Sequence, residues 1–224
     1  MNDEELTGRA RTHIVELREA DAAVHVHVKA AFQSLQHAAS MSGFELGVAS
    51  SFRDFDRQLA IWNGKYCGER PMFDAGGQLI DVKALSPPQR IAEILRWSAL
   101  PGASRHHWGT DLDLFDRKAA PAGYRVQLTQ AEFGADGIFA RLVAWLDAHA
   151  ARYGFFRPYR GIRSGVEPEP WHFSFAPVSE FARRRLTLAV LREALASAPL
   201  LGKEEVLAKL AQHHARYVAT IDWP

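Results

Sequence analysis

Apolar residues recur at two different spacings along this chain, and the change between them constrains the fold more than any other feature. In the early segment VKAAFQSLQHAAS, residues such as Phe32 and Leu35 lie three or four positions apart, which is typical of one helix face. In FELGVASSF, by contrast, Leu46 and Val48 occupy alternate positions, as in a strand. The first segment therefore predicts a helix over 28–40, and the second predicts a strand that leads into polar residues.

The same spacings predict the other regular elements of the chain. Further helices are predicted over 54–62, 90–100 and 138–149, further strands over 111–115 and 172–175, and two closing helices over 180–195 and 203–218. Residues 63–89 are rich in glycine, proline and aspartate, which predicts a long loop, and loops of this length often act as lids over functional sites. Short strands mixed with separate helices predict an α+β fold.

Length and charge narrow the classes of function. The 224 residues suffice for one hydrophobic core, so we predict a single domain over 1–224. The 27 Lys and Arg residues nearly balance the 26 Asp and Glu residues, and this balance argues against nucleic acid or a membrane as a partner. No stretch approaches the roughly 20 consecutive apolar residues that cross a bilayer. The expected partner is a small or neutral molecule, and the oligomeric state is not predicted.

The N-terminal segment MNDEELTGRARTHIVELREADAA bears on location. It has acidic residues where a secretory signal is basic, and it lacks the apolar stretch that such signals contain. We therefore expect a cytoplasmic location, or a periplasmic one if an export signal has been removed.

Any metal site in this chain must use histidines and carboxylates, because Cys67 is the only cysteine. The group SRHHWGTDLD offers His106 and Asp113, separated by a turn in which Gly109 permits unusual backbone angles. Far along the chain, the group EPWH adds His172. Two histidines and one carboxylate suit zinc, Zn2+, and leave one position open for water, which is typical of hydrolytic sites.

Two further residues have the chemistry that hydrolysis requires. Glu169 stands three residues before His172 and can accept a proton from a metal-bound water as that water attacks a carbonyl carbon. Arg53, at the end of the first predicted strand, stays charged and offers several donors to an oxyanion. The sequence therefore predicts a hydrolytic metal site rather than a structural one.

Three motifs in this order, SSFRDFDRQ, SRHHWGTDLD and EPWH, resemble those of the VanY-like D-alanyl-D-alanine carboxypeptidase family. That family belongs to the LAS zinc peptidases, which include L,D-carboxypeptidases, VanX-type dipeptidases and the hedgehog amino-terminal domain. The resemblance covers residues 28–176 and leaves a C-terminal helical extension over 178–224 unexplained. It implies a hedgehog/DD-peptidase-like zinc peptidase fold, in which helices pack around a small antiparallel sheet.

The resemblance also implies a role for each matched residue. The implied zinc ligands are His106, Asp113 and His172. The implied catalytic residues are the base Glu169 and the transition-state arginine Arg53. The implied substrate-binding residues are Ser104 and Gln58.

One position departs from the family pattern, since Asp111 stands where many members have alanine or another small residue. On a strand, Asp111 and Asp113 point to the same face, so Asp111 is expected either to touch the site or to compete as a ligand. His107 is expected to be a neighbour of the site rather than a ligand. His25 and His27 are expected at the start of the first helix, with a solvated or structural role.

The resemblance implies a zinc carboxypeptidase that removes the terminal D-alanine from peptidoglycan stem peptides. The expected cytoplasmic location favours L,D-cleavage of tetrapeptides, and D,D-cleavage of pentapeptides and a peptidoglycan endopeptidase are the alternatives. A zinc-binding module without catalysis is the alternative from another class. Glu169 and Arg53 argue against it, because a purely structural site needs neither.

Overall fold

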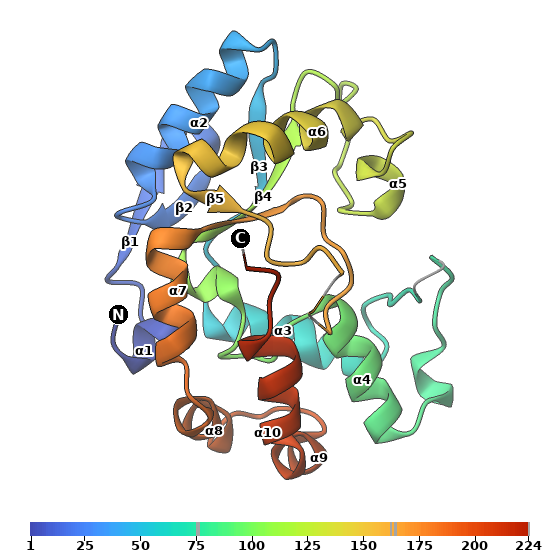
Figure 1. Cartoon of the computed structure of the whole chain (residues 1–224). Coiled ribbons are helices and arrows are strands. Elements are labelled where there is room, and N and C mark those ends of the chain that lie inside the picture. The colour runs from blue at the N-terminus through green and yellow to red at the C-terminus, as the bar shows by residue number, and fades with distance from the viewer. Residues whose placement is uncertain (75–76, 162, 164, 224) are drawn as a thin grey trace.

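The computed structural model describes residues 1–74, 77–161, 163 and 165–223, and an antiparallel sheet lies at its centre (Figure 1). Its strands pair in the order β3-β4-β6-β5, and a separate antiparallel hairpin joins β1 to β2. The strand bounds are β1 (Ile14–Leu17), β2 (Ala22–His25), β3 (Leu46–Ser50), β4 (Asp111–Asp116), β5 (Phe155–Phe156) and β6 (His172–Phe175). The predicted α+β fold is therefore confirmed. Strands β1, β2 and β5, of two to four residues each, are not predicted.

Helices surround this sheet. The α-helices are α1 (Asp3–Leu6), α2 (Lys29–Met41), α3 (Phe55–Tyr66), α4 (Pro87–Trp97), α5 (Gln130–Phe133), α6 (Ala140–His149), α7 (Ala176–Arg185), α8 (Leu188–Ala196), α9 (Lys203–Ala208) and α10 (Leu210–His213). The 3-10 helices are η1 (Arg18–Ala20), η2 (Val82–Ala84), η3 (Arg105–Trp108) and η4 (Ala150–Tyr153), and η5 (His214–Ala219) is a π-helix. Within the part of the chain that the structure describes, no helix combines the length and apolar character needed to span a bilayer.

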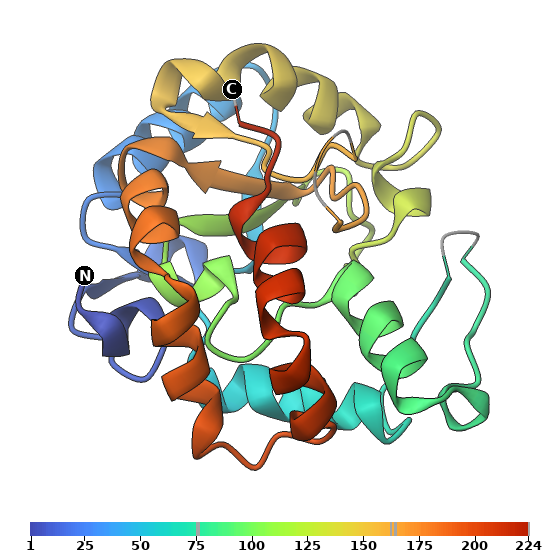
Figure 2. The ribbon, with the colours of Figure 1, turned by 60° about the horizontal axis from the view of Figure 1, so that its bottom comes forward.

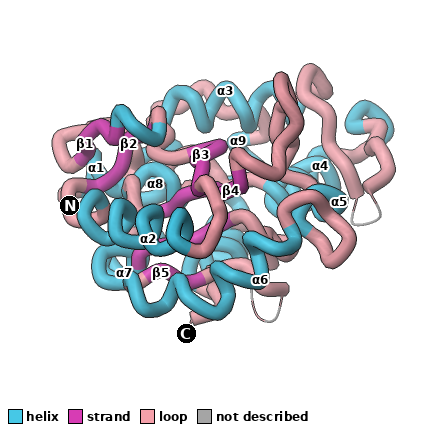
Figure 3. The backbone as a smooth tube through the Cα atoms, turned by 90° about the horizontal axis from the view of Figure 1, so that it is seen from above, coloured by secondary structure: helices cyan, strands magenta, loops and turns pink. Residues whose placement is uncertain are grey.

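The two faces of the sheet differ in chemistry because side chains alternate along each strand. On β4, Leu112 and Leu114 point to one face, where they join an apolar cluster with residues of α2 and α6. Asp111 and Asp113 point to the other face and are buried there. Figure 3 shows β3 and β4 between α3 on one side and α2 and α6 on the other. The polar face of the sheet therefore lies toward α3.

A second apolar cluster lies on the side of α3. It includes apolar side chains of the closing segment, which is residues 176–223. Trp62 of α3, Ile94 of α4 and Leu191 of α8 are fully buried members of this cluster. Trp62 Nε1 also donates a hydrogen bond to the carbonyl oxygen of Leu201 at 3.0 Å. Figure 2 shows the closing segment, in orange and red, next to the cyan helix α3. The closing segment thus shares a core with α3 and α4.

The predicted loop over 63–89 is shorter in the structure, for local reasons. Helix α3 continues to Tyr66, and α4 already begins at Pro87. Proline fits the first turn of a helix, and Ser86 caps α4 through a capping box. Residues 75–76 of the predicted loop lie outside the described residues.

The prediction of two continuous closing helices is wrong, because each is interrupted. The first divides into α7 and α8, since the Thr187 hydroxyl accepts a hydrogen bond from the Val190 N–H and starts a new helix. The second divides at Lys209 into α9 and α10, followed by η5. His25 and His27 also differ from expectation, since His25 ends β2 and is buried, and both precede α2.

Candidate metal centre and active site

The three predicted metal ligands come together where β4, β6 and η3 meet. Asp113 on β4 pairs directly with His172, the first residue of β6. Residues opposite each other in an antiparallel pair carry their side chains on the same face. His106 reaches them from η3, and one ligand atom of each residue lies within 4.8 Å of the others. These three buried residues are called the metal cluster below.

Hydrogen bonds fix which histidine nitrogens face the metal cluster. His106 Nδ1 donates to the carbonyl oxygen of Ser51 at 2.9 Å, so its Nε2 carries a lone pair, 3.5 Å from Asp113 Oδ2. His172 Nε2 donates to Asp111 Oδ1 at 2.9 Å, which turns its Nδ1 toward Asp113 Oδ1 at 3.2 Å. Asp113 Oδ1 is buried and accepts no hydrogen bond from the described residues. These three ligand atoms thus face one another, and together they fit a metal cation that would replace the proton on His172.

The electrostatics of the metal cluster also favour a positive charge. Burial lowers the pKa of His106 to about 4, so this ring is neutral, as a metal ligand must be. Burial acts in the same direction on His172, but its interactions with Asp111 and Asp113 outweigh burial and raise its pKa to about 10. Burial acts to raise the pKa of Asp113, yet His106 and His172 hold it below its usual value. The carboxylates therefore attract a positive charge to this point.

Asp111 lies behind His172 and is not one of the converging ligands. Besides the bond from His172, it accepts hydrogen bonds from Arg105 Nε at 2.8 Å, Thr110 Oγ1 at 2.5 Å and Ser174 Oγ at 3.0 Å. Burial acts to raise the pKa of Asp111, but the Arg105 guanidinium holds it well below its usual range. An ionised partner behind a ligating histidine fixes the ring and raises its basicity. Of the two expectations for Asp111, contact with the site is the one that the structure bears out.

Glu169 lies beside the nitrogen of His172 that faces the metal cluster. Its Oε2 is 3.3 Å from His172 Nδ1, and its backbone N–H donates to the carbonyl oxygen of Tyr159 at 3.0 Å. Burial raises the pKa of Glu169 to about 7. A carboxyl group with a pKa near neutrality can both accept and release a proton during one reaction cycle.

Arg53 lies in the turn that follows β3, next to the metal cluster. Its backbone N–H donates to the carbonyl oxygen of His106 at 3.2 Å. Its guanidinium donates to Gln58 Oε1 at 2.8 Å and to Ser50 Oγ at 3.0 Å. Burial lowers the pKa of Arg53, and the charge of Asp113 opposes this effect. The guanidinium is thus held in one orientation close to the ligands.

The two predicted substrate-binding residues are both buried. Gln58 is fully buried, with Oε1 accepting from Arg53 and Nε2 donating to the carbonyl oxygen of Ala99 at 2.8 Å. Its amide holds Arg53, so an effect of Gln58 on a substrate passes through Arg53. Ser104 directly precedes η3, two residues before His106, with 3% of its surface exposed.

His107 is not among the converging ligands, and it contacts the backbone of Arg53 instead. Its Nδ1 donates to the carbonyl oxygen of Arg53 at 2.6 Å, and its Nε2 accepts from the Gly102 N–H at 3.1 Å. The N-terminal segment approaches this ring at Gly8, where φ is +76°. A Cβ atom on Gly8 would lie 2.4 Å from His107 Nδ1, so both the backbone angle and the close approach require glycine.

The closing segment contacts the loop that leads to Glu169. The Asp222 carboxylate accepts hydrogen bonds from the backbone N–H groups of Arg160 and Arg163, at 2.7 and 2.8 Å. The Asp222 N–H donates to the carbonyl oxygen of Pro158 at 2.9 Å. The end of the closing segment therefore holds this loop shortly before Glu169.

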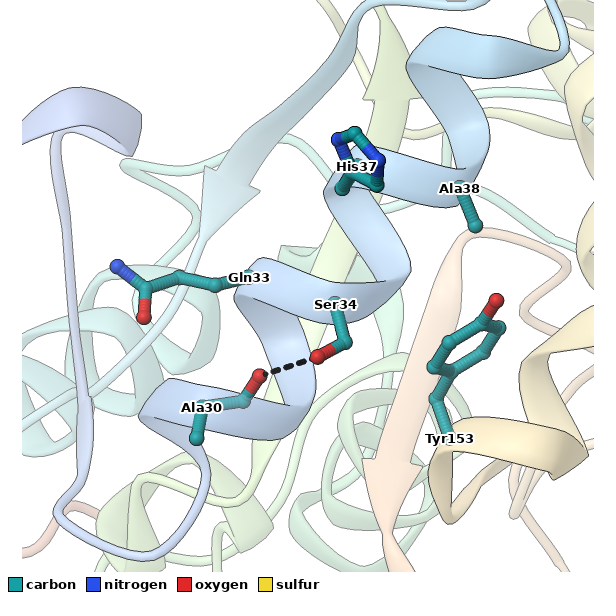
Figure 4. A pocket seen from close by; sticks show the side chains of 6 residues that line it. All are labelled: Ala30, Gln33, Ser34, His37, Ala38 and Tyr153. Carbon is teal, nitrogen blue, oxygen red and sulfur yellow. Dashed lines mark hydrogen bonds between the residues drawn. The ribbon is translucent and has the colours of Figure 1, made fainter.

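A hollow on the surface of α2 lies apart from these residues. It is lined by residues of α2 and by Tyr153 of η4, and Figure 4 shows the Ser34 hydroxyl donating to the carbonyl oxygen of Ala30 within it. None of the predicted site residues lines this hollow. Because α2 covers the apolar face of the sheet, the hollow lies away from the metal cluster.

Comparison with known sequences identifies the family of this chain. The family model for VanY, D-alanyl-D-alanine carboxypeptidase, matches residues 21–178. An uncharacterized protein of Haemophilus influenzae is 45% identical over 103 residues, which cover 45% of this chain and 70% of that protein. The D-alanyl-D-alanine carboxypeptidase of Enterococcus faecalis is 26% identical over 161 residues, which cover 69% of this chain and 49% of that protein.

Solved structures share the fold. VanYB in complex with D-alanine-D-alanine has a TM-score of 0.54 at 22% identity, covering 86% of this chain and 87% of its own. A VanY from a VanB-type resistance cassette, in complex with Zn(II), has a TM-score of 0.53 at 23% identity, covering 79% and 86%. The LdcB LD-carboxypeptidase has a TM-score of 0.52 at 20% identity, covering 85% and 80%. Since the family model spans most of the chain, from residue 21 to residue 178, this protein belongs to the VanY family of D-alanyl-D-alanine carboxypeptidases.

Proposed function

We propose that this protein is a zinc-dependent carboxypeptidase that removes the terminal D-alanine from peptidoglycan stem peptides, with the L,D bond of tetrapeptides as the favoured target. The observation that carries the proposal is the metal cluster with the Glu169 carboxylate and the Arg53 guanidinium close to it. A metal site that serves only stability needs neither an adjacent base nor an adjacent cation.

The metal cluster would hold zinc through His106 Nε2, a carboxylate oxygen of Asp113 and His172 Nδ1. Two histidines and one carboxylate suit zinc best among the common divalent ions. When bound, zinc supplies the positive charge that polarises a peptide carbonyl and lowers the pKa of a water molecule. The solved VanY with Zn(II), which shares this fold, supports the choice of metal.

Three residues would act on the peptide and the attacking water, and a fourth, Gln58, would orient one of them. Glu169 takes the proton of the water and passes it to the leaving amine, a role supported by its pKa of about 7. Arg53 donates to the oxyanion that forms at the scissile carbonyl. Gln58 keeps the guanidinium oriented, and the Ser104 hydroxyl helps to hold the substrate backbone or its terminal carboxylate.

The proposed preference for the L,D bond rests on the proposed location of the protein. The cytoplasmic location proposed from the N-terminal composition favours recycled peptides that end in a single D-alanine. The family description, D-alanyl-D-alanine carboxypeptidase, supports D,D-cleavage of pentapeptides as the second candidate. The two reactions use the same chemistry at the metal cluster and differ in the residue before the scissile bond.

Mass spectrometry of peptidoglycan peptides tests the proposal. Wild type, Glu169→Ala and the control Glu180→Ala are each incubated with tetrapeptides and pentapeptides, with and without a chelator. Glu180 is a suitable control because it pairs with Arg183 and Arg184 on α7. Wild type and control are expected to remove one alanine from tetrapeptides, whereas Glu169→Ala and the chelator abolish this loss.

The other outcomes each select another function. Cleavage of pentapeptides alone would replace L,D-activity by D,D-activity, and cleavage within cross-linked peptides would indicate an endopeptidase. Zinc binding without any cleavage would favour a binding module. A Glu169→Ala variant with normal zinc content and full activity would remove Glu169 from the role of base.

A further inference from the structure

Among the described residues, a partly buried lysine close to the active site forms no ion pair with a carboxylate. Lys65 lies near the end of α3, and its Nζ donates to the hydroxyl of Ser98 at 2.7 Å. None of the ion pairs found among the described residues includes Lys65. A buried charge without a counter-ion lowers stability, and an anion bound beside it would offset that cost.

Lys65 belongs to the same row of side chains as the residue that orients Arg53. Gln58 and Lys65 are seven residues apart on α3, about two helical turns, and so lie on one face of the helix. Both contact the segment after α4, since Gln58 donates to the carbonyl oxygen of Ala99 and Lys65 donates to Ser98. Gln58 and Lys65 therefore lie along α3, and the end of this row at Gln58 contacts Arg53, which precedes the helix.

The charges around Lys65 favour the binding of an anion beside it. Burial lowers its pKa to about 8, so the side chain is still largely protonated near neutrality. Arg53 and Arg70 add positive charge to its surroundings, and Glu169 is the carboxylate that acts on it. Glu169 is already committed to the metal cluster, with its Oε2 at 3.3 Å from His172 Nδ1. A second anion at this place would be stabilised by the lysine and by the neighbouring arginines.

We propose that Lys65, with the Ser98 hydroxyl, binds a carboxylate of the peptide substrate. This inference rests on the proposed function, because it takes the substrate to be a peptide cleaved near its carboxyl end. Two carboxylates of such a peptide have the required chemistry. One is the terminal carboxylate of the departing residue, and the other is a side-chain carboxylate on the residue before the scissile bond.

Calorimetric titration in a Glu169→Ala background tests this subsite without turnover. Three matched peptides are titrated: one with both carboxylates, one with a terminal amide, and one with the side-chain carboxylate replaced by an amide. Lys65→Met is expected to weaken binding of the first peptide by about 10- to 100-fold, as loss of a hydrogen-bonded charge does. Lys65→Arg is expected to keep most of the affinity, and Lys83→Met, which removes an exposed lysine, to keep all of it.

The peptides distinguish the two sources of the carboxylate. If the peptide with a terminal amide binds equally well with and without the Lys65→Met substitution, Lys65 pairs with the terminal carboxylate. If the peptide with the side-chain amide shows this equal binding instead, Lys65 pairs with the side-chain carboxylate. The inference is overturned if Lys65→Met lowers the affinity for all three peptides by the same factor, or for none of them.

Turnover of the otherwise wild-type enzyme separates this inference from the proposed function. With cleavable peptides, Lys65→Met is expected to raise KM with little change in kcat, because the lysine binds the substrate away from the metal cluster. An unchanged KM in an active Lys65→Met enzyme would reject only the subsite. A wild-type enzyme that cleaves no peptide would instead reject the proposed function.

Discussion

The two sides of the active site are held by different kinds of contact. On the metal side, Asp113 and His172 stand opposite each other in the register of β4 and β6, so backbone hydrogen bonds set their separation. On the substrate side, Arg53 and Lys65 are held by side-chain hydrogen bonds. A single bond of that kind contributes about 0.5–1.5 kcal/mol, whereas a strand pair is a cooperative unit. Metal binding is therefore expected to survive changes that impair peptide cleavage.

Asp113→Ala is expected to have the largest effect, because Asp113 lies between both histidines of the metal cluster. Metal affinity should fall by more than about 100-fold, beyond the loss that removal of an outer partner causes. Peptide cleavage should fall with it. Competition with a coloured chelator measures the affinity, and Asp147→Ala, on the surface of α6, is the control. Full metal affinity in Asp113→Ala would show that the metal binds elsewhere.

Arg53→Met tests the substrate side, and its effect should be nearly as large on the rate. Loss of one donor to an oxyanion lowers kcat by about 10²–10³-fold. Metal affinity should change much less than kcat, since the hydrogen bond that joins Arg53 to the metal cluster comes from its backbone N–H, which the substitution keeps. Arg57→Met removes an exposed arginine of the nearby helix α3 and serves as the control. If Arg53→Met also lowered metal affinity by a similar factor, metal binding would depend on the residues proposed to contact the substrate.

Asp111→Asn tests whether the charge behind His172 contributes to metal affinity. The substitution keeps the size of the side chain but removes the charge that Arg105 and His172 share. Metal affinity is expected to fall by about 10- to 100-fold, as for other outer partners of ligating histidines. Ser174→Ala removes one weaker contact to Asp111 and should cost less. Equal affinity in Asp111→Asn and wild type would mean that the charge of Asp111 does not tune His172.

Asp222→Ala tests whether the closing segment matters for the substrate side. The loop before Glu169 would lose two backbone contacts, so kcat is expected to fall by about tenfold through misplacement of the base. Zinc content should not change. Steady-state kinetics beside Asp136→Ala, an exposed aspartate, checks this expectation. An unaltered kcat would show that the loop holds its conformation without the closing segment.

The smallest effect expected is on thermal stability, from Lys65→Met. Burial lowers the pKa of Lys65 from 10.5 to about 8. Between these values the unfolded chain binds more protons than the folded chain, so the unfolding free energy of wild type rises with pH there. Below pH 8 the cost of burying the ammonium is fully present.

Lys65→Met should therefore raise Tm by about 2–4 °C near pH 7, and this gain should shrink as the pH rises from 8 toward 10.5. Scanning calorimetry at both ends of that range makes the measurement, with Lys83→Met as the reference. A gain of the same size at both pH values would show that the effect does not come from the buried charge.

Much of the metal side can be predicted from sequence because its residues stand in short motifs on regular elements. Alternation along β4 is enough to place Asp111 and Asp113 on one face. The pairing of β4 with β6 joins residues far apart in the chain, and only the family resemblance indicates it. The hydrogen bond from His172 to Asp111 depends on that pairing, so the spacing of residues does not predict it.

The substrate side has no comparable signal in the sequence. Lys65 contacts Ser98 from 33 positions away, and Asp222 contacts Arg160 from 62 positions away. No spacing of residues indicates such pairs, and Lys65 falls in a stretch predicted as loop, where α3 in fact continues. The breaks in the closing segment are equally hidden, because the apolar pattern runs on across Thr187 and Lys209.

The approach of Gly8 to His107 makes the geometry around Arg53 depend on a residue outside the segment that matches the family model. Residue 8 lies before the matched range 21–178 and is not one of the proposed ligands or substrate-binding residues. Any side chain there would displace a ring that donates to the backbone of Arg53. If every residue is substituted in turn and the variants are scored on peptide cleavage, most substitutions at position 8 are therefore expected to lower activity, although this position lies far upstream of every motif.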